Sequence, residues 1–363
     1  MRTFSNGNFM IQYPDEVSFC FNPSVINVTA SGNQTPGKVE MKTVAAGGTT
    51  YTENRAMFGK KCFFDASAYL QSSFDKSNFN HVGSTVEKSP VGTLFTITIS
   101  LYGTSGSLID SFGFDTFAVW GAMQLGERYN GDRTLTWFKN FPQTAGIYTA
   151  AAAKLSVTPT GSPKVDVDLS SRGVWHIPID RWSAASGLEM ILPASSGLST
   201  FDHTFDYTFQ GLANKAVRIT YTVDDSTCGQ YIRWINRHGF YDYYLFKEGD
   251  KTTQITNEGE FLRNNMQDYN FVNGYHGGTG VKQMKGEVQN IPVCAPLVDS
   301  ETYDFLLQVT ASPVVHLYCG KSPTGVPQWK AVNVSVGSFV KSRKNLQDFI
   351  ATIILPETRI QSL

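Results

Sequence analysis

The 363-residue sequence contains little charge: Asp, Glu, Lys and Arg together make up 17% of it, against about 25% in an average soluble protein. Exposed helix faces are normally filled with these residues, so the shortage disfavours a helical enzyme. The net charge is −1, and the basic residues cluster only at Lys341, Arg343 and Lys344. No long-range field would attract nucleic acid or an acidic membrane, and we expect neither as a partner.

Long apolar runs and paired cysteines are also missing. No stretch approaches 18 continuous apolar residues, and residues 1–7 lack the hydrophobic region of a signal peptide. We therefore expect no membrane insertion, no Sec export and synthesis in the cytoplasm. An odd, scattered set of cysteines disfavours both a disulfide framework and a zinc site, so we expect buried free thiols. The cysteines are Cys20, Cys62, Cys228, Cys294 and Cys319.

Catalytic motifs are missing as well. Residues 276–280 resemble the glycine-rich oxyanion loop of lipases, but the nucleophile elbow G-x-S-x-G that such enzymes need does not occur. The sequence has no G-x-G-x-x-G and no P-loop. We therefore expect no enzyme, no catalytic residue and no cofactor. A glycosidase built from two carboxylates remote in sequence stays open, although no pair is singled out.

Two acidic segments are candidates for a metal site. Asp166 and Asp168 would share one face of a strand, but two carboxylates fall short of the roughly six to eight oxygens that Ca²⁺ takes. Asp202 and His203 are neighbours on an expected strand, so their side chains would point to opposite faces. We expect a structural role for each and no metal site.

Two-residue alternation of apolar and polar side chains is present almost everywhere. Turn clusters such as residues 102–107, 129–132 and 160–163 separate the alternating segments. Many short strands at such intervals are typical of sandwiches and barrels. The prediction is a mainly β fold of tandem antiparallel β-sandwich or barrel-like domains. The clearest alternating segments are 94–102, 111–119, 165–169, 203–209 and 216–223.

The chain is too long for one ordinary core and should form at least two domains. The small, turn-rich stretch 193–199 is the best boundary candidate. We place an N-terminal β-region at residues 1–200, with room for two subdomains. A C-terminal β-domain with one helix follows at residues 201–363.

The predicted helix covers residues 301–311. Asp299 or Ser300 can cap its N-terminus, and Pro313 ends it. Its predicted apolar stripe consists of Tyr303, Leu306, Leu307 and Thr310. Near the end of the chain, residues 348–355 are almost continuously apolar, which predicts a strand in the centre of a sheet.

One hairpin is especially clear. Residues 231–236 and 240–246 flank a turn in which Gly239 can supply the positive φ that a tight connection needs. Aromatic residues lie on both faces, so we expect one face to meet the core of the domain and the other a neighbouring surface. The candidate interface or core aromatics are Tyr231, Trp234, Phe240, Tyr241, Tyr243 and Tyr244.

The tryptophans allow a second interpretation. They can anchor cores and protein interfaces, which we favour, or stack on sugar rings in a glycan-binding module. They are Trp120, Trp137, Trp175, Trp182, Trp234 and Trp329.

Several strings resemble uncharacterised tail and virion structural proteins of phages and prophages of Bacteroides-type bacteria. They are residues 63–72, 120–127, 133–142, 228–236 with 242–246, and 302–307 with 312–315. The resemblance covers most of the chain and implies a distal-tail or baseplate-like protein in the virion. Such a protein has tandem β-domains, forms a homo-oligomeric ring that is commonly a hexamer, and docks other tail proteins. The alternative is a glycan-binding module for host-surface recognition.

Overall fold

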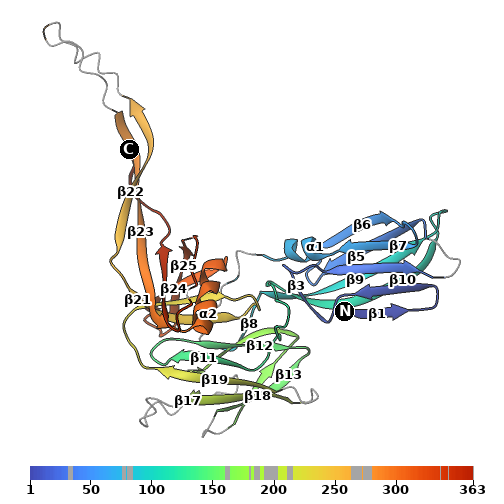
Figure 1. Cartoon of the computed structure of the whole chain (residues 1–363), viewed down its shortest axis with the longest axis horizontal. Helices are drawn as coiled ribbons and strands as arrows, with labels where there is room; N and C mark the ends of the chain where they lie inside the picture. The colour runs from blue at the N-terminus through green and yellow to red at the C-terminus, as the bar shows by residue number, and fades with distance from the viewer. Residues whose placement is uncertain are drawn as a thin grey trace. The chain divides into compact units, whose positions relative to one another are not determined.

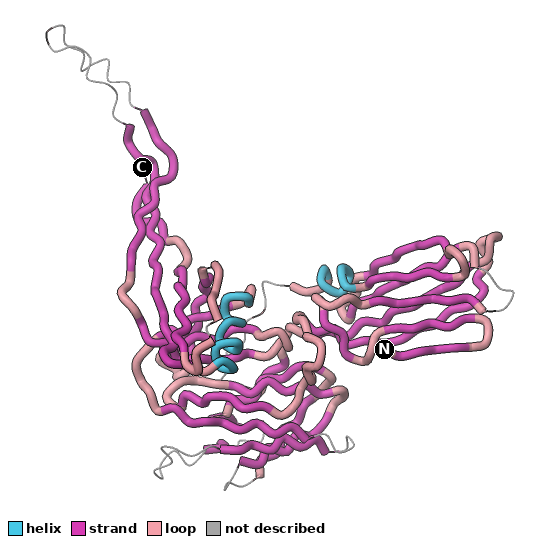
Figure 2. Tube along the Cα trace, in the orientation of Figure 1, coloured by secondary structure: helices cyan, strands magenta, loops and turns pink. Residues whose placement is uncertain are grey.

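The computed structural model of the chain is mainly β, as predicted (Figures 1 and 2). It describes residues 1–31, 36–75, 79, 85–159, 164–179, 181–183, 189–191, 203–210, 216–262, 272, 280–335, 337–341 and 343–362. In this part of the chain no helix is long and apolar enough to cross a membrane. The chain divides into two compact units. Unit 1 comprises Met1–Ser226, Ile235–Tyr243 and Lys321–Pro327, and unit 2 comprises Thr227–Trp234, Tyr244–Gly320 and Gln328–Leu363.

Unit 1 begins with a two-sheet sandwich, whose sheets have the orders β1-β2-β4-β7 and β3-β10-β9-β5-β6. Alternate side chains of these strands fill the core between the sheets, as Val39 and Met41 of β5 do. The elements are β1 (Arg2–Ser5), β2 (Phe9–Tyr13), β3 (Val17–Phe19), β4 (Val25–Ala30), β5 (Lys38–Ala45), β6 (Thr50–Ala56), β7 (Lys61–Asp65), α1 (Ser67–Ser72), β9 (Gly92–Tyr102) and β10 (Leu108–Val119).

A second pair of sheets in unit 1 has its own core. The sheet orders are β11-β19-β18-β13-β14 and β12-β15-β8, and both contribute side chains such as Leu155 and Ile147 to that core. The strands are β8 (Glu87–Lys88), β11 (Arg133–Phe138), β12 (Thr144–Thr149), β13 (Ala153–Pro159), β14 (Val165–Leu169), β15 (Gly173–Pro178), β18 (His203–Gln210) and β19 (Ala216–Asp224). A separate pair consists of β16 (Arg181–Ser183) and β17 (Glu189–Ile191).

The domain boundary near residue 200 does not agree with this arrangement. Strands β18 and β19 follow residue 200, yet they pair with β13 and β11 in one sheet. A cut at residue 200 would divide that sheet, and unit 1 extends to Ser226. The prediction failed because turn-rich composition marks loops within a domain as well as loops between domains. The stretch 193–199 itself lies outside the described residues.

Unit 2 is built on a closed barrel. Its sheet runs β21-β20-β24-β25-β26-β23-β22, and β21 also pairs with β23, which closes a ring of six strands. Strand β27 pairs with β23 outside this ring. The elements are β20 (Gln230–Ile235), β21 (Tyr241–Glu248), β22 (Thr252–Leu262), β23 (Gly280–Val298), α2 (Ser300–Ala311), β24 (Val315–Lys321), β25 (Pro327–Val334), β26 (Gln347–Ile354) and β27 (Thr358–Ser362).

Helix α2 confirms the predicted helix and its cap. The Asp299 carboxylate accepts a hydrogen bond from the Thr302 backbone N–H at 2.7 Å. The buried stripe, however, is Tyr303, Leu306 and Val309. Leu307 and Thr310 are only half-buried, so the predicted stripe was rotated toward the wrong side of the helix.

Helix α1 was not predicted. It has six residues and buries only Leu70, which is too short for a helical period to be visible. Strand β26 lies between β25 and β23, so its central position is confirmed. Its two faces differ, though: Phe349 is fully buried and Ile350 is 61% exposed.

The cysteines follow the prediction only in part. All five are free thiols, and Cys20 and Cys62 are buried. Burial raises the pKa of Cys20 to about 12, so this thiol is inert at neutral pH. Cys228 and Cys319 are exposed and Cys294 is half-buried, which corrects the expectation of uniformly buried thiols.

Candidate functional site in the aromatic hairpin

The aromatic hairpin, β20 and β21, forms where the sequence predicts it. The side-chain oxygen of Asn236 accepts hydrogen bonds from the N–H groups of His238 (2.9 Å) and Phe240 (3.0 Å). The Asn236 N–H donates to the Phe240 carbonyl at 2.8 Å. Gly239 has φ +77°, a conformation that glycine adopts at no steric cost. These contacts fix the turn and therefore the register of both strands.

The predicted aromatics are buried within the chain itself. Trp234 is fully buried and packs against Phe305 of α2, with ring centroids 5.2 Å apart. Tyr244 is half-buried. The other four, which are Tyr231, Phe240, Tyr241 and Tyr243, are at most 5% exposed. Of the two roles considered, interface or core, their burial corresponds to the core.

The tip of the hairpin, residues 235–243, belongs to unit 1 and is held there by three aromatic side chains. The Phe240 ring stacks on Tyr129 with an interplanar angle of 8° and centroids 5.6 Å apart. The Tyr243 hydroxyl hydrogen-bonds the Thr144 hydroxyl at 2.7 Å. The Tyr241 hydroxyl donates to the Phe79 carbonyl. Three separate contacts therefore hold the start of β21 in unit 1.

The side chain of Glu127 contacts the turn of the hairpin. Its carboxylate contacts the Arg237 guanidinium at 2.8 Å and His238 Nε2 at 3.1 Å, and it accepts the Gln124 N–H at 2.7 Å. Partial burial by itself would raise the pKa of Glu127. The Gln124 and His238 hydrogen bonds and the charge of Arg237 outweigh it and hold the pKa below its usual value. Glu127 therefore stays ionised at neutral pH.

The absence of a side chain at Gly121 lets the hairpin turn approach the backbone closely. A Cβ atom at this position would lie 2.0 Å from the Arg237 carbonyl oxygen. The neighbouring Ala122 N–H donates to that same oxygen at 2.8 Å. The close backbone approach, and with it the hydrogen bond, requires a residue without a side chain at position 121.

Asp242 is a buried acid at the tip, 7% exposed. Its carboxylate accepts a hydrogen bond from the Asn236 side-chain amide at 2.9 Å. Burial raises the pKa of Asp242 to about 6, although the Asn236 hydrogen bond and the charge of Arg133 act in the opposite direction. This carboxyl group titrates close to neutral pH, but its burial and its amide partner fit a structural role.

In unit 2, a cation lies buried among rings. Arg233 is 1% exposed, donates to His316 Nδ1 at 3.4 Å and lies 4.1 Å over the Trp329 ring. Burial, followed by the charge of Arg233, lowers the pKa of His316 to about 4. His316 is therefore neutral at pH 7, which leaves a nitrogen free to accept the hydrogen bond from Arg233.

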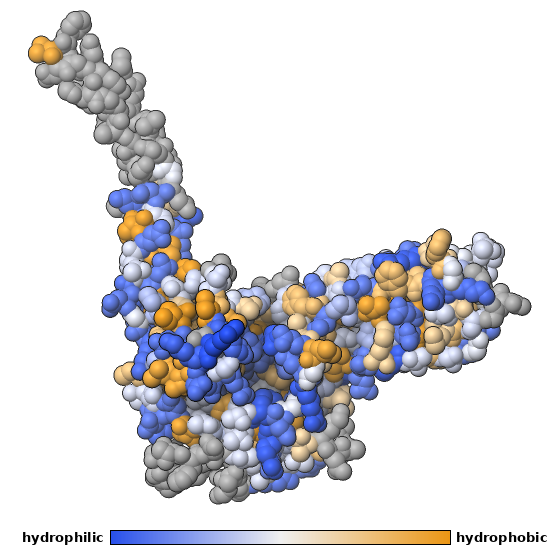
Figure 3. Space-filling view, in the orientation of Figure 1, coloured by the Kyte–Doolittle hydropathy of each residue, from blue (hydrophilic) through white to orange (hydrophobic). Residues whose placement is uncertain are grey.

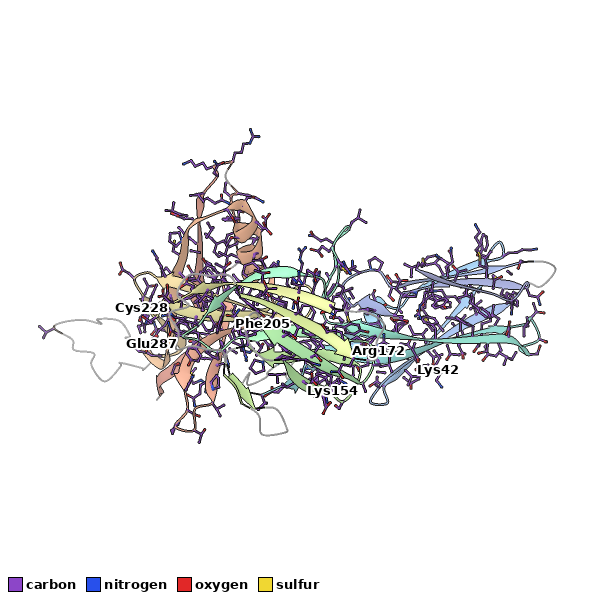
Figure 4. The ribbon with its side chains drawn as sticks, turned by 90° about the horizontal axis from the view of Figure 1, so that it is seen from below. Lys42, Lys154, Arg172, Phe205, Cys228 and Glu287 are labelled. Carbon is purple, nitrogen blue, oxygen red and sulfur yellow. The ribbon has the colours of Figure 1, made fainter. Side chains whose placement is uncertain are left out.

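Of the candidate metal and catalytic segments, the one at Asp166 has protein partners for that carboxylate, and the other segments lie outside the described residues. Asp166 accepts a hydrogen bond from Ser156 at 2.8 Å and pairs with Lys164 at 3.2 Å and with Lys154 (Figure 4) at 3.8 Å. Asp202, the side chain of His203 and residues 276–279 lie outside the described part of the chain. Within that part, no three His, Cys, Asp or Glu side chains are placed to hold a metal ion.

The described tryptophans do not form an exposed platform for sugar rings. Trp120, Trp137, Trp175 and Trp234 are at most 8% exposed. Trp329 is half-buried under Arg233, and the side chain of Trp182 is not described.

Sequence reasoning missed Glu127 and Gly121 as partners of the hairpin. Each lies more than a hundred residues before the turn that it contacts. Neither position has a local pattern that marks it, and only the fold brings the two segments together.

No protein-family model matches the chain, and no curated protein matches it. Among solved structures, the tetra-tandem repeat in the extending region of a large adhesion protein matches this chain, and the match covers 97% of this chain's length. The match covers 99% of that chain at 9% identity and a TM-score of 0.25. A TM-score this low does not establish a common fold, so nothing about function follows from it.

Proposed function

We propose that this chain is a non-enzymatic structural protein of a bacteriophage virion. In this role it is a tail or baseplate component, similar to a distal-tail protein, that assembles with copies of itself and docks other tail proteins. The phage assignment rests on the sequence strings described above. The observation that carries the self-assembly is the arm of unit 2, formed by β22, the first part of β23 and β27.

The arm extends beyond the barrel of unit 2 (Figure 1). Strand β23 has 19 residues. Its second part, from Asn290 to Val298, pairs with β26 in the barrel, whereas residues 280–287 pair with β22 and β27. The face of the arm seen in Figure 3 mixes hydrophilic and hydrophobic residues. Ordering such an extension costs about 1–2 kcal/mol of backbone entropy per residue, and contacts with another protein would offset that cost.

Composition supports the same role. A chain in which only 17% of the residues are charged suits a protein that buries a large area on assembly, because the cores of protein interfaces are depleted of charged residues. Obligate interfaces bury roughly 2,000 Å² or more. We therefore propose a ring, with six copies as the number that the resemblance implies. The buried tryptophans do not favour the glycan-binding alternative.

Mass spectrometry of purified phage particles tests the virion assignment. Tryptic peptides of this chain should copurify with intact particles, at several copies per particle, and persist after a high-salt wash. A particle preparation that infects normally but lacks these peptides would contradict the assignment.

A further inference from the structure

Strand β22 hydrogen-bonds to β23 through the backbone groups on one of its sides, and the backbone groups on its other side face away from β23. On β23, the Pro292 carbonyl accepts the Gly249 N–H at 2.8 Å, so it points toward β21 and β22. The Gln289 carbonyl accepts the Leu355 N–H at 2.9 Å and points the opposite way. Because successive residues of a strand direct their backbone groups to alternate sides, the even-numbered residues of β23 bond to β22.

The register then identifies the open groups. Thr252, Gln254 and Thr256 lie opposite even-numbered residues of β23 and are bonded to them. The N–H and C=O groups of Thr253, Ile255 and Asn257 therefore point outward. Strand β22 ends the order of its sheet, so no described strand pairs with this outer side.

The part of this outer side formed by residues 252–257, which we call the β22 edge, lacks the charges and proline that normally prevent edge pairing. Edge strands are usually short, or carry charges or proline, or are covered. Strand β22 has 11 residues, about twice the usual length. Its segment 252–257, Thr-Thr-Gln-Ile-Thr-Asn, contains no charge and no proline. The Ile255 side chain is 51% exposed, so its apolar surface is available for contact with another chain.

We propose that the β22 edge pairs with the β22 edge of a second copy, antiparallel about Ile255. This inference rests on the proposed self-assembly and names its contact. In this register Thr253 lies opposite Asn257 of the second copy, and the two Ile255 side chains meet. The segment is self-complementary: polar side chains able to hydrogen-bond face each other, the apolar side chains pack together, and no like charges are opposed.

The pairing also restricts the copy number. A contact that uses the same surface on both partners is two-fold and joins copies in pairs. An assembly that uses this contact throughout therefore contains an even number of chains, as a hexamer does.

Charge substitutions at Ile255 test the pairing. Because the side chain is half exposed, I255K and I255E should fold like the wild type, which circular dichroism and thermal melting check. Each variant alone places like charges opposite each other and should lower the mass measured by light scattering. An equimolar mixture of I255K and I255E places opposite charges across the two-fold axis and should restore the wild-type mass.

Proline at Thr253 gives an independent test, because it removes an outward N–H and leaves the bonds of β22 to β23 intact. T253P should lower the mass, whereas the matched control T253A should not. If the wild-type chain assembles and neither T253P nor the charge variants change the mass of the assembly, this inference is wrong. Self-assembly itself would still hold. If the charge variants lower the mass and their mixture does not restore it, the two-fold pairing is wrong. A wild-type chain that is monomeric would overturn both.

Discussion

Asp242 links the stability of unit 1 to pH at the level of a single residue. Its pKa is about 6 in the folded chain, raised by burial from an ordinary value of 3.8. Between pH 4 and 6 the folded state therefore holds a proton that the unfolded state has released. Stability contributed by this group is present at low pH and is lost as the pH rises through about 6.

Replacement of Asp242 by Asn should remove that loss. The amide keeps an acceptor for the Asn236 side chain and cannot ionise. At pH 8 we expect D242N to increase the free energy of unfolding by on the order of 3 kcal/mol, and at pH 4 by much less. Denaturant titrations of both proteins at the two pH values measure this. An equal difference between wild type and variant at both pH values would contradict the account.

At the scale of elements, the tip of the aromatic hairpin depends on a glycine remote in sequence. G121A would force a Cβ atom against the Arg237 carbonyl, a backbone atom that cannot rotate away. We expect a loss of roughly 1–3 kcal/mol in the free energy of unfolding, typical of overpacking. Chemical denaturation monitored by tryptophan fluorescence provides the measurement.

Gly113 is the matched control for this substitution. It lies in a strand of the same unit, and a Cβ atom there would have its nearest neighbour, the Thr98 hydroxyl, at 3.8 Å. G113A should change the free energy of unfolding by less than about 0.5 kcal/mol. Equal effects of G113A and G121A would show that the close approach of the Arg237 carbonyl is not what position 121 provides.

Burial also decides how the hairpin aromatics can be used in experiments. Trp234 and Tyr243 are obvious positions for alanine substitution if the hairpin is taken as an interface. Trp234 is fully buried, and removal of such a side chain costs about 3–5 kcal/mol. Loss of assembly in W234A would therefore report unfolding, whereas the exposed Ile255 reports the contact itself.

The sequence was sufficient for elements whose signals are local. The cap at Asp299 and the apolar residues that follow it predicted α2, and the turn with Gly239 predicted the aromatic hairpin. Helix α1 has too few residues for a period, and the stripe of α2 depended on Val309, which no local feature distinguishes from Leu307. The contact of Glu127 with Arg237 and His238 could not be predicted, because it depends on the tertiary fold alone.

At the scale of the whole chain, the mainly β class followed from alternation and turn spacing, but the domain boundary did not. Composition near residue 200 resembles a linker, whereas the pairing of β18 with β13 crosses it. The closed barrel of unit 2 depends on the pairing of β21 with β23, which joins residues such as Lys247 and Cys294 that are 47 positions apart. Such closure follows from strand order in space, which hydrophobic periodicity does not encode.

Self-assembly is the central claim about the whole chain, and the mass of the purified protein tests it most directly. Size-exclusion chromatography with light scattering should give an even multiple of 40.1 kDa, six-fold for a hexameric ring, with a value that is constant over a wide range of protein concentrations. A mass of 40.1 kDa at the highest concentration that stays in solution would contradict the account.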